Sequence, residues 1–276
     1  MLLAIDVGNT NLVLALGDRT GQSGDDTGGR GGSCHSIVAR YRIETRAMTD
    51  PQGSEAVIRA ALGEMAGKVD DAIIASVVPD VTGPVVAAMT AITGSAPLIV
   101  GTDDVDLGIA VNIDVPSQAG ADRLVNAVGA MAHYDVPAIL LDFGTATTLD
   151  LVGEDGGYEG GIIAPGVALS IEALERAAAQ LPRLELRAFD VDLPVLGKNT
   201  VAAMESGVFW GYVGMIEGLL QRLREEHAAG NTDGQQLPAI ATGGLAGLFA
   251  AHLSGITAVD PDLTVRGLFE IYTRNR

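Results

Sequence analysis

The sequence is poor in cysteine and in basic side chains, and each shortage excludes a class of protein. Cys34 is the only cysteine among the 276 residues, so no disulfide can form within the chain, and a reducing cytoplasm suits it. Lys and Arg number 17 against 35 Asp and Glu, which gives a net charge of −18. This acidic balance repels phosphate backbones and anionic membranes, so we expect neither nucleic acid nor membrane as a partner.

Long apolar runs and a secretory signal are also lacking. No uninterrupted apolar stretch approaches the ~20 residues that a membrane-spanning helix needs. The first five residues lead directly to Asp6, without the basic start and long apolar segment of a signal peptide. We therefore expect a cytoplasmic protein. Its length and its 47% hydrophobic content suffice for one large domain or two ordinary ones.

Several widespread catalytic motifs are absent as well. The Gly-Lys pair at 197–198 is followed by Asn199, so it does not complete the phosphate-binding motif G-x-x-x-x-G-K-[S/T]. No G-x-G-x-x-G joins a strand to a helix, and no serine occupies a nucleophile elbow. Cys34 and His35 have no further ligands near them in sequence, which argues against a metal site there. The common nucleotide-binding and serine-hydrolase motifs are therefore missing.

What the sequence does contain is a segment that occurs twice. Leu3–Leu16 and Ile139–Val152 each consist of an apolar strand, an Asp-x-Gly turn and a second apolar strand, with Asp6 aligned to Asp142. A carboxylate at a strand end can hold a hydrated cation, and the glycine lets the backbone approach a ligand. The Thr and Asn residues of the turns can donate to phosphate oxygens. Two such turns predict a two-sided phosphate clamp, with ordinary polar hairpins as the alternative.

The remaining pattern alternates helices and strands. Apolar periodicity predicts helices at 54–65, 81–92, 120–133, 168–179 and 200–227, and short buried strands at 72–78, 98–100 and 240–242. A third turn, Thr242–Gly244, would let a nucleoside lie against the backbone. We expect an α/β protein whose two halves place their hairpins at a shared cleft.

The helix predicted from Thr200 contains glycines in two G-x-x-x-G spacings, at 207 and 211 and at 214 and 218. Each glycine would destabilise an isolated helix by about 1 kcal/mol relative to alanine. Glycine is tolerated where another backbone comes close, so the spacing predicts a tight contact with a second helix.

Seven blocks in a fixed order resemble the superfamily of sugar kinases, actin and heat-shock chaperone ATPases, and within it the type III pantothenate kinases. The blocks are Asp6-Val-Gly-Asn-Thr-Asn11, Ser76-Val-Val-Pro79, Gly120-Ala-Asp-Arg-Leu-Val-Asn-Ala127, Asp142-Phe-Gly-Thr-Ala-Thr-Thr148, Gly161-Ile-Ile-Ala-Pro-Gly166, Gly197-Lys-Asn-Thr200 and Ala241-Thr-Gly-Gly244. The Gly-Ala-Asp-Arg block is the most discriminating. The resemblance implies two duplicated ribonuclease-H-like halves around an ATP cleft. We expect domains at 1–117 and 118–276, with the last helix packing back on the first domain.

The resemblance also implies an activity and the residues for it. The reaction would be ATP-dependent phosphorylation of pantothenate to 4′-phosphopantothenate, the first step of coenzyme A synthesis, in a homodimer. Asp122 would be the general base, Asp142 would bind a monovalent cation (potassium or ammonium), and Asp6 would serve the magnesium ion through ATP. The implied ATP-binding residues are Asp6, Val7, Gly8, Asn9, Thr10, Asn11, Leu12, Val13 and Thr145. The implied pantothenate-binding residues are Gly120, Ala121, Asp122, Arg123 and Thr200.

The residue chemistry by itself agrees with a kinase. Phosphorylating an alcohol needs a carboxylate that accepts the hydroxyl proton and cationic or N–H groups that hold an anionic acceptor, and Asp122 and Arg123 supply both. The alternative is a helix-capping Asp beside a solvated Arg. The chain departs from its relatives in two places. Val111–Pro116 lacks the aromatic residue that often precedes the Gly-Ala-Asp-Arg block, and the Gly-rich segment 21–33 is longer than expected.

Two other functions remain open from the sequence. One is a sugar-type kinase of the same superfamily, against which the Gly-Ala-Asp-Arg block argues. The other is an inactive regulatory relative, which would be free to lose its acidic residues. Asp6, Asp122 and Asp142 are all retained.

Overall fold

The computed structural model describes residues 1–19, 35–177, 182, 184, 194–230 and 236–276, so the Gly-rich segment 21–33 and Cys34 lie outside the described residues. Contacts divide the chain into two compact units, which we describe separately. The first consists of Met1–Val136, Val152–Gly160 and Asp262–Arg276, and the second of Pro137–Leu151 and Gly161–Pro261. The expected domain boundary after residue 117 stays a prediction. By contacts, residues 118–136 and the C-terminal helix group with the first unit.

The first unit is built on a five-stranded mixed sheet with the order β3-β2-β1-β4-β5. The central strand β1 (Leu2–Val7) pairs antiparallel with β2 (Asn11–Arg19) and parallel with β4 (Asp71–Ser76). The outer strands are β3 (His35–Glu44), antiparallel to β2, and β5 (Leu98–Ile99), parallel to β4. β1 is almost entirely buried, as expected for a strand covered on both faces.

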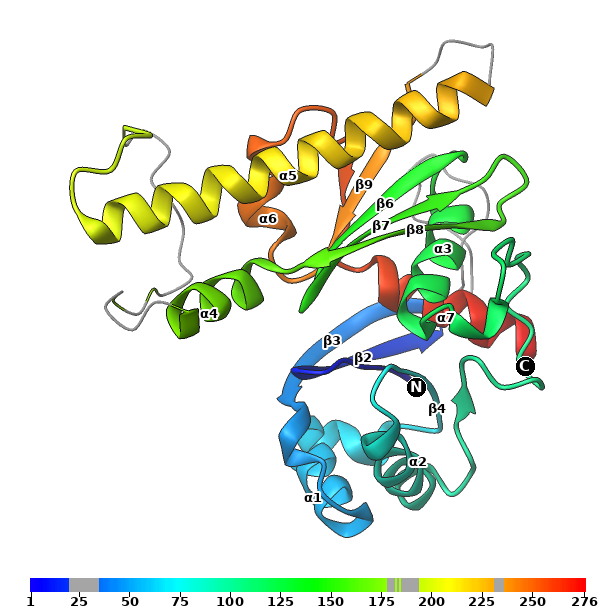
Figure 1. The fold of residues 1–276 in the computed structure, drawn as a ribbon. Coiled ribbons are helices and arrows are strands. Elements are labelled where there is room, and N and C mark those ends of the chain that lie inside the picture. The colour runs from blue at the N-terminus through cyan, green and yellow to red at the C-terminus, as the bar shows by residue number, and fades with distance from the viewer. Residues whose placement is uncertain (20–34, 178–181, 183, 185–193, 231–235) are drawn as a thin grey trace. The chain divides into compact units, whose positions relative to one another are not determined.

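Helices cover both faces of this sheet (Figure 1). On one face, α1 (Pro51–Leu62) and α2 (Pro79–Thr93) share a core with inward side chains of β1 and β2. On the other, α3 (Ala121–His133) and α7 (Leu263–Asn275) pack against the opposite side chains of β1 and β4. Short 3₁₀ helices occur at Thr45–Ala47, Gly63–Lys68, Pro116–Gln118 and Ala250–His252.

Helix α1 begins and ends about three residues before the predicted range 54–65. At its start, the Asp50 side chain accepts a hydrogen bond of 2.8 Å from the backbone N–H of Gly53, and Pro51 occupies the first turn. At its end, Gly63 adopts a positive φ of 57°. These capping residues, rather than the apolar spacing, set the limits of the helix.

The sheet of the second unit repeats the strand order of the first. Its order is β10-β9-β6-β7-β8, with the first strand of the sequence again central and flanked on one side by the next two. The strands are β6 (Ala138–Phe143), β7 (Ala146–Val152), β8 (Tyr158–Pro165), β9 (Ala239–Thr242) and β10 (Ala258–Val259). Asp6 and Asp142 are each the next-to-last residue of a central strand. The expected duplicated α/β fold is confirmed.

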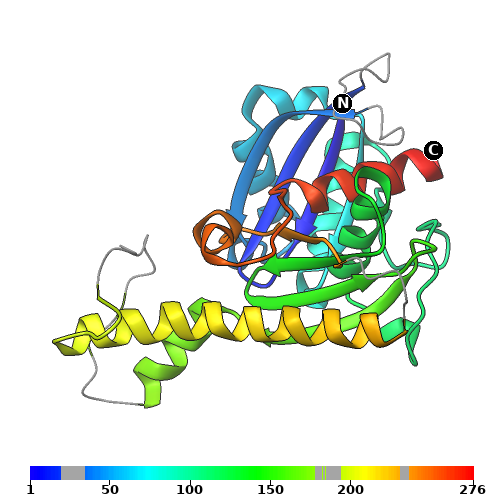
Figure 2. The ribbon, with the colours of Figure 1, turned by 90° about the horizontal axis from the view of Figure 1, so that it is seen from above.

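The described residues of the second unit also form the helices α4 (Val167–Ala177), the long α5 (Thr200–Gly230) and the short α6 (Ala246–Phe249). α5 crosses one face of the sheet, and α4 lies beside its N-terminal half (Figures 1 and 2). Phe143, Phe209, Tyr212 and Phe249 join strand and helices in one buried cluster. No helix in the described part of the chain is long and apolar enough to cross a membrane.

The tight helix contact predicted at the glycines of α5 is not made within the described part of this chain. A Cβ atom placed on Gly207, Gly211, Gly214 or Gly218 would find no atom within 4 Å beyond the backbone of α5 itself. The helix contacts the sheet through its other face, with Phe209, Val213 and Ile216. The glycine face therefore has no intrachain partner among the described residues.

Candidate active site

In the first unit, the turn after β1 carries the predicted phosphate-binding residues. The N–H of Gly8 donates to the carbonyl of Asn11 at 3.0 Å, and a Cβ on Gly8 would lie 3.1 Å from that oxygen. Thr45 secures the turn from outside, because its Oγ1 donates to the Gly8 carbonyl at 2.6 Å and its N–H donates to the Thr10 carbonyl at 3.0 Å. Thr45 is buried, and it was not identified from the sequence. The turn is therefore held in a fixed shape.

The residues of the segment Asp6–Val13 differ in what they can offer a ligand. Asn9 and Thr10 are exposed, and Asp6 is half-buried. Val7 and Leu12 are fully buried in the core on the side of α1 and α2. A ligand at this turn could therefore meet Val7 and Leu12 only through their backbone groups, whereas the side chains of Asn9 and Thr10 are accessible.

The start of α3 carries the candidate base. Asp122 and Arg123 stand in the first turn of the helix, and the Oδ1 atom of Asp122 accepts the Arg123 N–H at 2.9 Å. A Cβ on Gly120 would lie only 2.6 Å from this Oδ1 atom, so a side chain at 120 would displace the carboxylate. The partial positive charge of a helix N-terminus stabilises an ionised carboxylate, the form that accepts a proton.

In the second unit, three glycine-containing turns converge. The Gly243 residue that follows β9 has a φ of 90°, and a Cβ there would lie 2.4 Å from the Asp142 Oδ1 atom and 2.7 Å from the Phe143 nitrogen. A Cβ on Gly166 would lie 2.2 Å from the carbonyl oxygen of Thr145. The sequence blocks around Asp142, Gly166 and Gly243, far apart in the chain, thus form one surface.

A buried hydrogen bond connects this surface to α5. The Tyr212 hydroxyl bonds to the hydroxyl of Thr147, and both side chains are buried. Burial raises the pKa of Tyr212 above its ordinary value, and the nearby negative charge of Asp142 raises it further, although the bond to Thr147 acts in the opposite direction. The Tyr212 ring also packs on Phe249, 4.6 Å between centroids, and Phe249 stacks on Phe143, the residue after Asp142. Through these contacts Tyr212 of α5 stabilises the turn that follows Asp142.

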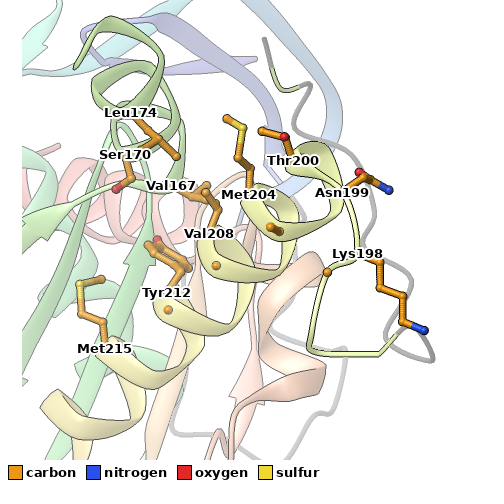
Figure 3. Close-up of a pocket in the computed structure, with 14 residues that line it drawn as sticks. Val167, Ser170, Leu174, Lys198, Asn199, Thr200, Met204, Val208, Tyr212 and Met215 are labelled. Atoms are coloured by element: carbon orange, nitrogen blue, oxygen red, sulfur yellow. The ribbon is translucent and has the colours of Figure 1, made fainter. Parts of the chain in front are cut away.

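Thr200 stands at the first position of α5, beside a cavity of about 840 Å³ between α4 and α5 (Figure 3). The helix start is fixed by Asn199, whose side chain accepts the Ala202 N–H at 2.9 Å. The cavity is lined mainly by apolar and small residues: Val167, Ser170, Leu174, Gly197, Lys198, Asn199, Thr200, Ala203, Met204, Gly207, Val208, Gly211, Tyr212 and Met215. Thr200 is exposed at its edge.

The predicted site residues thus fall into two sets, one in each unit. The Asp6 turn and Gly120–Arg123 belong to the first, and Asp142, Thr145 and Thr200 to the second. Among the described residues, no three His, Cys, Asp or Glu side chains are close enough to form a metal cluster. The roles assigned to individual residues stay predictions.

Comparison with solved structures identifies the type of fold. One is a proposed Baf family transcriptional activator from Campylobacter jejuni, 16% identical, with a TM-score of 0.60 and coverage of 99% of this chain and 98% of that chain. Another is a proposed 2-dehydro-3-deoxygalactonokinase from Sinorhizobium meliloti, 16% identical, with a TM-score of 0.54 and coverage of 99% and 96%. The fold is that of the sugar kinase and actin-like ATPase superfamily.

Sequence relatives define the family within this class. The profile described as type III pantothenate kinase matches residues 2–222. Type III pantothenate kinases of Paramagnetospirillum magneticum and Rhodospirillum centenum are each 45% identical to the chain, cover all of it, and are themselves covered to 98% and 99%. The chain belongs to the type III pantothenate kinase family.

Proposed function

We propose that the chain transfers the γ-phosphoryl group of ATP to the 4′-hydroxyl of pantothenate, giving 4′-phosphopantothenate, the first intermediate of coenzyme A synthesis. The observation that carries this proposal is the family membership over the whole chain, together with an Asp-Arg pair in the first turn of α3. A carboxylate and a guanidinium side by side are what an anionic alcohol requires.

In this reaction Asp122 accepts the proton of the pantothenate hydroxyl as its oxygen attacks the γ-phosphorus. A P–O bond forms to the acceptor while the bond to the β–γ bridging oxygen breaks, and ADP leaves with the electron pair. Gly120 leaves room for the carboxylate, since a Cβ there would collide with it. Arg123 balances the negative charge of the acceptor.

The two Asp-x-Gly turns are the proposed ATP-binding elements. Backbone N–H groups and the exposed side chains of Asn9, Thr10 and Thr145 suit phosphate oxygens. Magnesium would neutralise charge on the transferred phosphoryl group, with Asp6 beside it. Asp142 is the proposed ligand of a monovalent cation, potassium or ammonium, and Gly243 lies against its carboxylate, since a Cβ there would be 2.4 Å from the Oδ1 atom.

The experiment that tests the substrate is an acceptor panel. Initial rates of ADP release from ATP and magnesium would be measured with pantothenate and with a set of hexoses and N-acetylated amino sugars. We expect release that depends on pantothenate alone. Release that depends on a sugar instead would establish the sugar-type kinase, and no release with any acceptor would favour the inactive regulatory relative.

The proposed assembly is a homodimer through the glycine face of α5. Gly207, Gly211 and Gly214 are exposed, and Leu169 and Leu174 of the neighbouring α4 are exposed apolar side chains. In Figure 3, Met204 and Val208 of α5 face α4 across the cavity. An apolar surface with exposed glycines suits close packing against the helices of a second copy. A cytoplasmic location without nucleic-acid or membrane partners stays a prediction from the sequence.

A further inference from the structure

The guanidinium group of Arg123 lies over an aromatic ring. Its Cζ atom is 5.5 Å from the centroid of the Tyr158 ring, a separation at which the face of the ring attracts a cation. Arg123 is in the first turn of α3, and Tyr158 is the first residue of β8, a strand whose residues 158–160 group with the first unit, so both partners of the contact belong to that unit. The Tyr158 side chain is only 1% exposed.

Tyr158 is held in place by its own backbone. Its N–H donates to the Ala110 carbonyl, and its carbonyl accepts the Asn112 N–H, both at 2.8 Å, which forms an isolated bridge with Val111. The Asn112 side chain also donates to the Glu159 carboxylate at 2.7 Å. Residues 111–116 contribute no aromatic side chain, and the ring beside this segment comes from β8 instead. The ring is therefore a fixed surface.

A ring that lies below the Cζ atom of an arginine restricts the guanidinium without accepting a conventional hydrogen bond from its N–H groups. Arginine binds a carboxylate through these N–H groups, which lie in the plane of the guanidinium. A long arginine side chain otherwise loses considerable rotamer freedom when it binds a ligand. If a ring already restricts the arginine before the ligand binds, less conformational entropy is lost on binding. The contact is therefore expected to affect the affinity for the acceptor rather than the chemical step.

We propose that Tyr158 is a positioning residue for acceptor recognition: its ring orients the Arg123 guanidinium toward the anionic acceptor. This inference rests on the proposed role of Arg123 in holding pantothenate. The Tyr158 hydroxyl is not needed for it, since the ring face makes the contact.

Three variants and one double variant test the inference. Tyr158→Leu removes the ring, Tyr158→Phe keeps it, and Arg123→Gln removes the cation, while Tyr158→Leu combined with Arg123→Gln closes a double-mutant cycle. Phe269→Leu is the matched control, because Phe269 is an equally buried aromatic residue of the same unit that contacts His35 instead. For each variant, KM for pantothenate, KM for ATP, kcat and the melting temperature would be measured.

We expect Tyr158→Leu to raise KM for pantothenate by roughly three- to thirtyfold, with KM for ATP unchanged, and Tyr158→Phe to remain near wild type. Phe269→Leu should lower the melting temperature without changing KM for pantothenate. In the Arg123→Gln background, Tyr158→Leu should have little further effect on that KM.

Each other result rejects the inference. An effect of Tyr158→Leu that persists in the Arg123→Gln background, or that Phe269→Leu reproduces, would mean that the ring acts through stability alone. If Arg123→Gln raises KM for pantothenate and Tyr158→Leu does not, only the inference fails. If Arg123→Gln leaves that KM unchanged, the proposed role of Arg123 fails with it.

Discussion

A carboxylate that acts only by accepting a proton can be replaced by an amide of nearly the same shape, which makes Asp122→Asn an informative substitution. The amide cannot accept the hydroxyl proton, so kcat should fall by about 10²–10⁴-fold. Binding of ATP, measured by calorimetry without pantothenate, should stay within about twofold of wild type. Near-normal turnover in this variant would remove Asp122 as the base.

Gly243 gives a second test at the scale of one residue, because both its conformation and its surroundings exclude a side chain. Its φ is 90°, and a Cβ would collide with Asp142 and Phe143. Gly243→Ala should lower the free energy of unfolding by about 1–3 kcal/mol and reduce kcat/KM for ATP. Gly247→Ala is the control, since nothing lies within 4 Å of a Cβ there. It should leave activity unchanged, and equal behaviour of the two variants would contradict the account.

The sequence predicted the residues of the turns but not the residues that support them. Asp6 and Asp142 stand out because the same pattern occurs twice in a strand–turn–strand context. Thr45, Tyr158 and Tyr212 stand out by no local pattern, since each contacts a site residue only after folding. Thr45 contacts the Gly8 turn across 37 positions of the chain. Spacing rules reach only a few residues along a helix or strand, so such contacts are beyond them.

At the scale of elements, the helices were predicted with small errors that have specific causes. α3 and α5 begin within one residue of their predicted starts, because Gly120 and Asn199 precede long apolar periodicities. α1 is displaced because Asp50 and Pro51 begin it and Gly63 ends it. The block Gly161–Gly166 was identified through the family resemblance, whereas the place of residues 161–165 in β8 was not predicted. A strand rich in glycine and proline gives little apolar alternation.

Tyr212 on α5 provides a test of how that helix supports the Asp142 turn. Tyr212→Phe removes the partner of the buried Thr147 hydroxyl and should lower the free energy of unfolding by about 1–2 kcal/mol, measured by denaturant titration. Thr147→Val and the double variant complete a double-mutant cycle. Either substitution should lower the free energy of unfolding less when the other is already present than it does in the wild type. Fully additive costs would mean that the two hydroxyls do not depend on each other.

The raised pKa of Tyr212 predicts how the difference in unfolding free energy between wild type and Tyr212→Phe depends on pH. Because burial raises the pKa above its ordinary value of 10.0, the phenol stays protonated across the neutral range. The stabilisation that the buried phenol provides is complete below the pKa that Tyr212 has in the unfolded chain. It is lost as the pH rises through the pKa that Tyr212 has in the folded protein. The stability difference between wild type and Tyr212→Phe should therefore be constant between about pH 6 and pH 9 and shrink above about pH 10. A difference that changes between pH 6 and pH 9 would contradict this assignment.

At the scale of the whole molecule, the duplication was readable from the sequence because both sheets begin with the same hairpin. The strand order, with two later strands added beside the first strand of each sheet, was not predicted from the sequence and is a finding of the structure. The glycine spacing of α5 predicted a close helix contact, but a sequence does not tell whether the neighbouring helix belongs to the same copy. Among the described residues no atom of this chain lies close to a Cβ on these glycines, which supports the proposed contact with a second copy.

The proposed dimer can be tested by blocking the glycine face with a large side chain. Gly211 is exposed with no atom near a Cβ, so Gly211→Arg should leave the protomer folded while obstructing a second copy. Gly83→Arg on α2 is the control, since Gly83 is also helical, exposed and open. Light scattering after size exclusion should give a dimer for wild type and Gly83→Arg and a monomer for Gly211→Arg. A dimer in all three would place the interface elsewhere.

The most direct test of the account is the rate at which 4′-phosphopantothenate forms from ATP, magnesium and pantothenate, followed by phosphorus NMR in parallel potassium and sodium buffers of equal ionic strength. We predict a phosphomonoester that appears only when pantothenate is present, at a rate several-fold higher in potassium. Equal rates in both salts would retain the kinase and reject the cation role of Asp142. The absence of the phosphomonoester in both buffers would contradict the central claim.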